Sequence, residues 1–203
     1  MNTFLPKERW DYLHHIANVS SKLDGHMAEL GVASGKVCIE LAKTHKHKKI
    51  YAFDTFTGFS DLTEEYFEAS PKYDAKFYQE KFGHVHDWDR TWGHKFLWED
   101  IISELKMYEN IEIRRGIFPE TSVGLENERY CFVHLDVDIY SSTRFGLEYF
   151  YNRMVTGGNI VIDDFFLKDR FIGVKDAVDE AILKFNIPRY EVTCEGQCVI
   201  IKP

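Results

Sequence analysis

The sequence predicts an α/β protein in which one mostly parallel β-sheet lies between helices and carries an antiparallel strand at its C-terminal end. Short apolar runs that are typical of buried strands alternate with segments of helical periodicity along most of the chain. Such alternation implies right-handed βαβ crossovers and therefore parallel strands. Near the C-terminus, two strand-like runs are joined directly by the turn Glu195-Gly196, and this hairpin supplies the antiparallel strand.

Each element follows from its local pattern. The strands predicted to be parallel lie at residues 26–30, 49–54, 111–114, 130–136 and 159–163, and the hairpin strands lie at residues 190–193 and 198–202. Helices are predicted at residues 35–45, 99–107, 142–155 and 174–185. The helices fall between successive strands, as the crossovers of a parallel sheet require.

Composition indicates a single domain over residues 1–203. With 203 residues, 44% of them hydrophobic and 15% aromatic, the chain can bury a full core without disulfides. The four cysteines are scattered along the chain, which is typical of a protein of the reducing cytoplasm. The formal net charge of −8 argues against nucleic-acid binding, and no apolar run has the length of a membrane span or the form of a secretory leader. We therefore expect a cytoplasmic protein with neither nucleic acid nor membrane as its partner.

Residues 60–98 interrupt the alternation of strands and helices. Aromatic side chains are frequent there, and so are charged residues and the histidines His84, His86 and His94. An insertion of this length usually has a functional role, so this one is a candidate lid. The alternative is a helical excursion that only covers one end of the sheet. A zinc site built from the three histidines is a poor fit, because no cysteine pair accompanies them.

Three aspartates follow two of the buried-looking runs. Asp136 ends the run at residues 131–136, and Asp163 and Asp164 end the run at residues 158–164. Because the carboxyl ends of parallel strands open onto one crevice, the three carboxylates are expected to face each other. An oxygen-only cluster of like charges suggests a hard divalent cation such as magnesium. The alternative is that Asp136 and Asp163 are turn residues and Asp164 is a helix cap.

The first strand leads into a glycine-containing loop, Gly31 to Gly35, that precedes a helix. Glycines there permit a tight turn and the close approach of a ligand, and the start of the helix offers N–H groups to that ligand. Glu29 precedes the loop, and Asp54 ends the next strand at about the spacing of an acid that accepts ribose hydroxyls. A nucleotide-like cofactor fits this edge of the sheet. Otherwise the loop is an ordinary strand-to-helix turn, and Asp54 caps the turn at Thr55.

Five segments together resemble the macrocin O-methyltransferase (TylF/MycF) family, over a stretch from about Asp24 to Ala181. These segments are residues 24–32, 53–59, 116–121, 134–143 and 157–165. Known members are class I enzymes that use S-adenosylmethionine and magnesium and methylate sugar hydroxyls of macrolide antibiotics. The resemblance therefore implies a Rossmann-like class I methyltransferase fold, a three-layer sandwich with a seven-stranded sheet. It also implies a small hydroxylated acceptor as partner and a homodimer as a possible assembly.

The resemblance assigns the candidate residues one by one. Asp136, Asp163 and Asp164 match the metal-binding acids, and Asp136 is the candidate catalytic residue. Asp138 is expected to cap the helix predicted from residue 142. The cofactor-binding candidates shape the methionine side of the site, hold the ribose or lie near the adenine, and they are Glu29, Gly31, Ser34, Gly35, Asp54, Thr55, Phe56, Gly116, Ile117 and Phe118.

The implied reaction is methyl transfer to an oxygen. The sulfonium of the cofactor already makes the methyl group electrophilic, so the protein has to hold the acceptor oxygen in line with the S–CH₃ bond. A magnesium ion would bind adjacent hydroxyls of the acceptor and lower the pKa of one of them. The residue that takes the proton is left open between Asp136 and a histidine of residues 60–98.

Two other classes of protein are weighed against this reading. A nucleotide-dependent oxidoreductase would carry the G-x-G-x-x-G arrangement that brings backbone against a pyrophosphate, and the loop after Glu29 lacks it. A catalytically silent binding module would have no need of the acids, and Asp136, Asp163 and Asp164 are all present.

Overall fold

A computed structural model gives the fold, and the structure describes residues 5–58, 98–166, 172–193 and 196–203. The predicted insertion at residues 60–98 therefore lies outside the described residues, apart from Trp98. His84, His86 and His94 are among the residues left out. In the part of the chain that is described, no helix is both long and apolar enough to cross a membrane.

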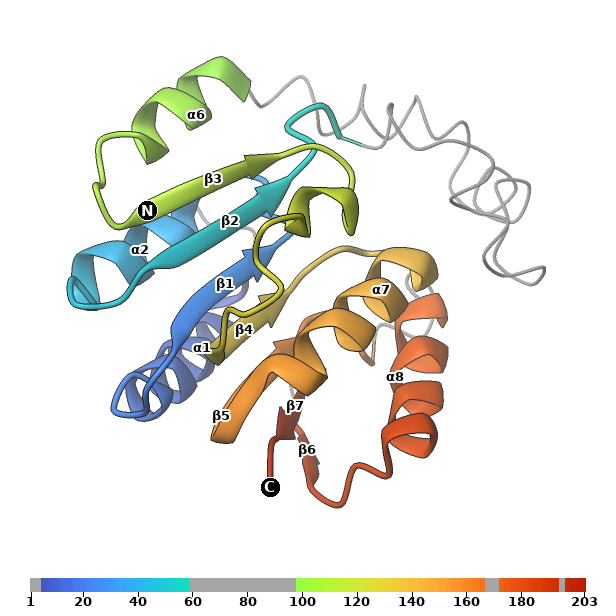
Figure 1. Cartoon of the computed structure of the whole chain (residues 1–203). Helices are drawn as coiled ribbons and strands as arrows, with labels where there is room; N and C mark the ends of the chain where they lie inside the picture. Colours follow the sequence, from blue (N-terminus) through green and yellow to red (C-terminus); the bar gives the residue numbers. More distant parts are fainter. Residues whose placement is uncertain (1–4, 59–97, 167–171, 194–195) are drawn as a thin grey trace.

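The sheet has seven strands in the order β3-β2-β1-β4-β5-β7-β6 (Figure 1). β1 to β5 pair in parallel, and β7 is antiparallel to both of its neighbours. This arrangement confirms the predicted fold class, including the antiparallel strand at the C-terminal end. The bounds of the strands are β1 His26–Leu30, β2 Ile50–Asp54, β3 Ile111–Arg115, β4 Tyr130–Leu135, β5 Met154–Ile162, β6 Tyr190–Val192 and β7 Cys198–Ile201.

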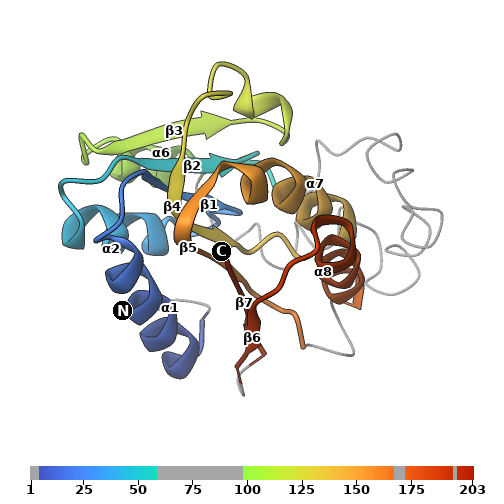
Figure 2. The same cartoon turned by 60° about the horizontal axis from the view of Figure 1, so that its bottom comes forward.

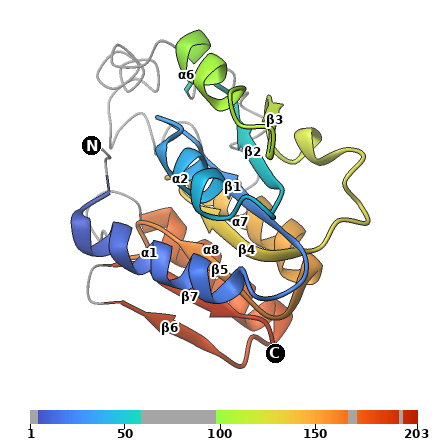
Figure 3. The same ribbon diagram turned by 90° about the vertical axis from the view of Figure 1, so that its left-hand side faces the viewer.

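Helices cover both faces of the sheet and complete three layers. Figure 2 shows α1 and α2 on the opposite side of the sheet from α7 and α8, and in Figure 3 α1 and α2 lie in front of the strands. Residues of α6 join the core cluster on the α1 and α2 face. The helices are α1 Lys7–Ser20, α2 Lys36–Thr44, α6 Trp98–Leu105, α7 Tyr140–Phe150 and α8 Ile172–Phe185, with short 3₁₀ helices η2 Glu120–Ser122 and η3 Tyr151–Arg153.

Three elements, α1, α7 and β5, differ clearly from the sequence prediction. Helix α1 was not predicted, and the helix predicted at residues 142–155 was wrong at both ends. α7 begins two residues earlier and stops at Phe150, and after η3 the chain enters β5 at Met154. β5 is longer than expected because Met154 already pairs with Tyr130, and a shift of register then lets β5 pass its two glycines before Asn159 pairs with Phe132.

Aromatic rings fill the core on the α7 and α8 face. Phe118 stacks on Phe150 with 5.7 Å between the ring centroids, and it meets Phe53 edge-on at 5.4 Å. Tyr130 meets Phe150 edge-on at 5.0 Å. Edge-on and offset contacts of this kind are the favoured arrangements of aromatic pairs, so this cluster holds α7 firmly against the strands.

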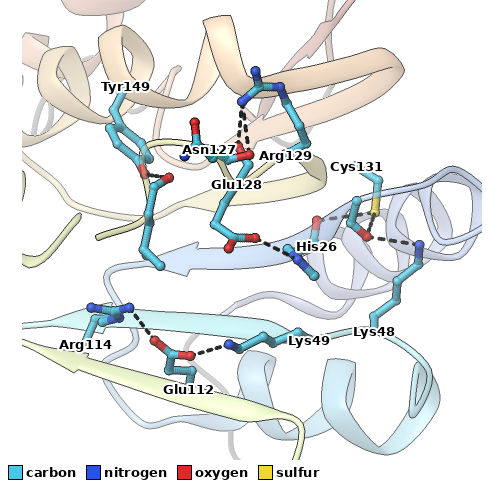
Figure 4. Close-up of polar contacts among 12 residues, drawn as sticks. His26, Lys48, Lys49, Glu112, Arg114, Asn127, Glu128, Arg129, Cys131 and Tyr149 are labelled. Carbon is cyan, nitrogen blue, oxygen red and sulfur yellow. Dashed lines mark hydrogen bonds and ion pairs between the residues drawn. The ribbon is translucent and has the colours of Figure 1, made fainter. Parts of the chain in front are cut away.

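Polar contacts join the segments at the amino ends of the strands (Figure 4). His26 pairs with Glu128 at 2.8 Å, and Glu112 pairs with both Lys49 and Arg114. Lys48 donates from Nζ to the carbonyl oxygen of Gly25 at 3.1 Å, next to the start of β1. These contacts lie mostly at the amino ends of the strands, whereas open α/β sheets bind ligands at the carboxyl ends.

Candidate active site

The β1–α2 loop and the end of β4 touch at the carboxyl edge of the sheet. Gly31, the first residue of the loop, has φ of +91°, and a Cβ added there would lie 1.9 Å from the carbonyl oxygen of Asp136. Only glycine permits both this backbone conformation and this approach. The structure thus brings the two sequence motifs, the glycine loop and the acid-bearing strand end, into direct contact.

Asp54 ties the loop to the end of β2. Its Oδ2 accepts hydrogen bonds from the backbone N–H groups of Val32 at 2.7 Å and Ala33 at 3.0 Å, and its Oδ1 accepts one from Phe56 at 2.7 Å. The turn role that was the alternative for Asp54 is therefore present in the structure. It also places the carboxylate directly against the loop.

The other cofactor candidates follow the carboxyl ends of β1, β2 and β3, at different depths. Gly35 has φ of +75° and precedes the first residue of α2, and Ser34 beside it is half-buried. Gly116 and Ile117 are also half-buried, whereas the rings of Phe56 and Phe118 lie in the core. Thr55 donates from Oγ1 to the carbonyl oxygen of Gly58 at 2.6 Å and so closes its own turn.

Strained backbone is concentrated at this edge. Among the described residues, five that are not glycine have positive φ, and four of them flank the candidate site: Ala33, Phe56, Asp138 and Asp164. Such conformations cost free energy and persist where the surrounding structure imposes them, which is typical of functional sites. Asp138 and Asp164 tolerate the left-handed region better than most residues do, because aspartate is enriched there.

Three carboxylates form a cluster above β4 and β5. One oxygen each of Asp136, Asp138 and Asp164 lies within 4.8 Å of the other two. Burial and the neighbouring carboxylates raise the pKa of all three side chains. The expectation that Asp138 caps a helix is wrong, because α7 begins at Tyr140 after Ile139 and has no side-chain cap. Asp138 turns instead towards the acids.

Asp163 is close to this cluster but is held by an arginine. Nη1 of Arg9, on α1, donates to Oδ2 of Asp163 at 2.9 Å and to Oδ1 of Asp164 at 3.1 Å, and all three side chains are buried. The other oxygen of Asp163, Oδ1, is buried without a hydrogen-bond partner among the described residues. The sequence analysis missed Arg9, since it lies 154 residues from Asp163 and no local motif marks it.

The donor set of the cluster fits a hard divalent cation. It consists of carboxylate oxygens only, which magnesium prefers over nitrogen or sulfur ligands. Like charges this close, with raised pKa values, gain from a compensating positive charge. The orphaned oxygen of Asp163 adds a further acceptor at the edge of the cluster.

A protein-family model and one curated protein match the sequence. The model, described as macrocin-O-methyltransferase (TylF), matches residues 2–193. The curated protein is demethyldecarbamoylnovobiocin O-methyltransferase of Streptomyces niveus, which is 23% identical over 186 residues. The alignment covers 87% of this chain and 65% of that protein, so the chain spans slightly less than two thirds of the relative's length.

Solved structures of O-methyltransferases share the fold. The O-methyltransferase NovP superposes with a TM-score of 0.79 at 20% identity, covering 98% of this chain and 81% of its own. The TDP-rhamnose 3'-O-methyltransferase CalS11 of calicheamicin biosynthesis gives 0.60 at 15% identity, covering 98% and 82%. An O-methyltransferase from Bacillus cereus in complex with SAH gives 0.57 at 14% identity, also covering 98% and 82%. At these identities the likeness establishes the fold.

Proposed function

The chain belongs to the macrocin-O-methyltransferase (TylF) family, and we propose that it transfers a methyl group from S-adenosylmethionine to a hydroxyl of a small, sugar-containing metabolite with the help of magnesium. The contact between Gly31 and the carbonyl oxygen of Asp136 carries this proposal. It puts a donor bound at the loop next to an acceptor bound at the acids. Methyl transfer needs that adjacency, because the acceptor oxygen must approach the S–CH₃ bond in line.

S-adenosylmethionine is the proposed donor, and the β1–α2 loop is its proposed site. The methionine part would lie along Gly31, Ser34 and Gly35, and Asp54 would accept hydrogen bonds from the ribose. Support comes from the position of the Asp54 carboxylate, which is already against the loop amides. Further support comes from the Bacillus cereus O-methyltransferase of the same fold, whose structure is a complex with SAH.

Asp136, Asp138 and Asp164 are the proposed ligands of magnesium, with Asp163 as the further candidate. A bound magnesium ion would supply a Lewis acid that lowers the pKa of an acceptor hydroxyl. The acids themselves orient the acceptor, and Asp136 is our proposed proton acceptor, because it directly follows β4 and touches the loop.

A sugar-containing metabolite is the proposed acceptor. The curated relative is named for O-methylation of demethyldecarbamoylnovobiocin, and CalS11 is named for O-methylation of TDP-rhamnose at its 3' position. Rhamnose is a sugar, so one protein of this fold is named for a sugar acceptor. Sugars present vicinal hydroxyl pairs, and an oxygen-liganded cation binds such pairs well.

Two measurements test the proposal. Isothermal titration should give binding of S-adenosylhomocysteine and none of NAD. Mass spectrometry should then detect methylated product when nucleotide-linked sugars and novobiocin-type glycosides are offered with magnesium, and much less product with a chelator. Binding of NAD without binding of S-adenosylhomocysteine would contradict the proposed donor. Methyl transfer at the same rate with and without the chelator would contradict the proposed role of the metal.

Asp136→Asn tests the catalytic assignment. We expect turnover to fall by at least about 100-fold, the usual size of a lost general base, while the affinity for S-adenosylhomocysteine stays close to that of the wild type. Asp11→Asn is the matched control, because Asp11 is an exposed aspartate on α1 that pairs with Lys7. Normal turnover of Asp136→Asn would remove Asp136 from the mechanism.

A further inference from the structure

His134 is a fully buried histidine on β4 that none of the proposed steps uses. It pairs in register with Glu29 on β1, so the two side chains stand next to each other on the same face of the sheet. Nδ1 of His134 lies 3.0 Å from Oε1 of Glu29. The imidazole is 0% exposed and the carboxylate-bearing residue 2% exposed, so water competes little with this contact.

The surroundings of the ring determine its tautomer. A carboxylate only accepts, so the proton of the contact belongs to Nδ1 of His134. Nε2 of His134 is buried without a hydrogen-bond partner among the described residues. A proton on Nε2 would be an unpaired buried donor, at a cost of roughly 1–3 kcal/mol. The contacts of the ring therefore favour a hydrogen on Nδ1, from which His134 donates to Glu29.

The other oxygen of Glu29 reaches the start of α2. Oε2 accepts a hydrogen bond from the backbone N–H of Cys38 at 3.1 Å, and Cys38 is the third residue of that helix. The first N–H groups of a helix have no partner within the helix, so Glu29 caps α2 from a neighbouring strand. Because α2 directly follows Gly35, the position of this helix sets the path of the loop from Gly31 to Gly35.

We propose that His134 is a positioning residue for the cofactor site, acting through Glu29. His134 orients the Glu29 carboxylate towards α2, and Glu29 anchors the C-terminal side of the loop as Asp54 anchors its N-terminal side. Glu29 is nearly inaccessible, so its part in cofactor binding is to shape the loop. The proposal rests on the proposed function, since it assumes that the loop binds S-adenosylmethionine.

Two substitutions of His134 separate its hydrogen bond from its bulk. In His134→Asn the side-chain amide can donate near the position of Nδ1, whereas His134→Leu fills space but donates nothing. Isothermal titration with S-adenosylhomocysteine should show about tenfold weaker binding for His134→Leu, and less than about threefold weaker binding for His134→Asn, since loss of one hydrogen bond to a charged group is worth about this much. Equal affinities of His134→Leu and the wild type would overturn the proposal, and so would an Asn variant as weak as the Leu variant.

His45→Leu is the matched control for a purely structural effect. His45 is equally buried, and its Nε2 is likewise without a partner among the described residues. It follows the last residue of α2, at the end away from the loop. We expect His45→Leu to lower the melting temperature without weakening the binding of S-adenosylhomocysteine. A loss of affinity equal to that of His134→Leu would overturn the proposal.

Nitrogen-15 NMR of histidine-labelled protein tests the proposal without a substitution at His134. In the wild type His134 should show a protonated Nδ1, and Glu29→Gln should alter its Nδ1 resonance. A bare Nδ1 in the wild type would overturn the proposal. Failure of the proposed function is distinguishable, because a wild-type protein that binds no S-adenosylhomocysteine contradicts both, whereas binding that is insensitive to His134 contradicts only this inference.

Discussion

Gly31 lets the two parts of the candidate site, the glycine loop and the acid-bearing end of β4, approach closely because it has no side chain. Its positive φ and its approach to the carbonyl oxygen of Asp136 exclude any other residue. The glycine loop was recognisable in the sequence because turns of this kind need glycine. The partner of the glycine was not recognisable, because the contact lies between strands that are distant in the sequence.

Gly31→Ala should unfold the loop or push the acids apart. An added Cβ would overlap the Asp136 carbonyl, so we expect a loss of stability of at least about 1–3 kcal/mol, as for overpacked cores, together with loss of S-adenosylhomocysteine binding. Urea unfolding and titration measure the two effects. Gly124→Ala is the control, because Gly124 has φ of +86° and no atom within 4 Å of an added Cβ. If both variants lose the same free energy of unfolding, the steric contact at Gly31 is not the cause of the loss in Gly31→Ala.

The sequence predicted a cluster of aspartates, but not which aspartates form it. Asp136, Asp163 and Asp164 were chosen because they end apolar runs, and the structure places all three at one edge of the sheet. Asp138 was expected to cap a helix instead. That expectation failed because β4 ends at Leu135 and Asp138, beyond it, adopts a left-handed conformation and faces the other acids.

At the scale of elements, α1 couples the N-terminus to the site. Leu13 and Ala17 of α1 are in the core, and Oγ of Ser20 accepts a hydrogen bond from Nδ2 of Asn159 on β5 at 2.9 Å. Arg9 adds the buried ion pairs with Asp163 and Asp164. The sequence did not indicate this helix, since its apolar positions are few and its anchors are polar groups on distant strands.

Arg9→Met should cost roughly 3–5 kcal/mol of unfolding free energy, because it leaves buried charges without their partner. Lys7→Met is the control, since Lys7 forms an exposed pair with Asp11 on the same helix, and loss of an exposed pair changes stability little. Urea denaturation of both variants gives the comparison. Similar losses for the two would mean that the Arg9 pairs add little to the docking of α1.

For the whole molecule, the raised pKa values of the acids link stability to pH. An aspartate in the unfolded chain titrates near about 3.9, whereas the pKa values of Asp136, Asp138 and Asp164 are raised in the fold. The folded protein therefore binds more protons above that pH than the unfolded chain does. Their contribution to stability is fully present below the unfolded pKa and is lost as the pH rises through the folded values.

Asp138→Asn should therefore stabilise the metal-free protein at pH 7, by about 1–2 kcal/mol, as relief of a strained site often does. The gain in stability should shrink as the pH falls towards about 3.9, the pKa of an ordinary aspartate. Excess magnesium should raise the melting temperature of the wild type and have much less effect on the variant. Urea and thermal unfolding at several pH values, each with chelator or magnesium, check this. A variant less stable than the wild type in chelator at pH 7 would contradict it.

The two edges of the sheet differ in what they hold together. At the amino ends of the strands, ion pairs such as His26 with Glu128 are local and partly exposed, and they brace the scaffold. At the carboxyl ends, buried charges and left-handed residues depend on one another across four strands. Substitutions are thus unequally tolerated along the chain: the partly exposed pairs can be replaced one at a time, whereas loss of Arg9 leaves the buried carboxylates of Asp163 and Asp164, 154 and 155 residues away, without their partner.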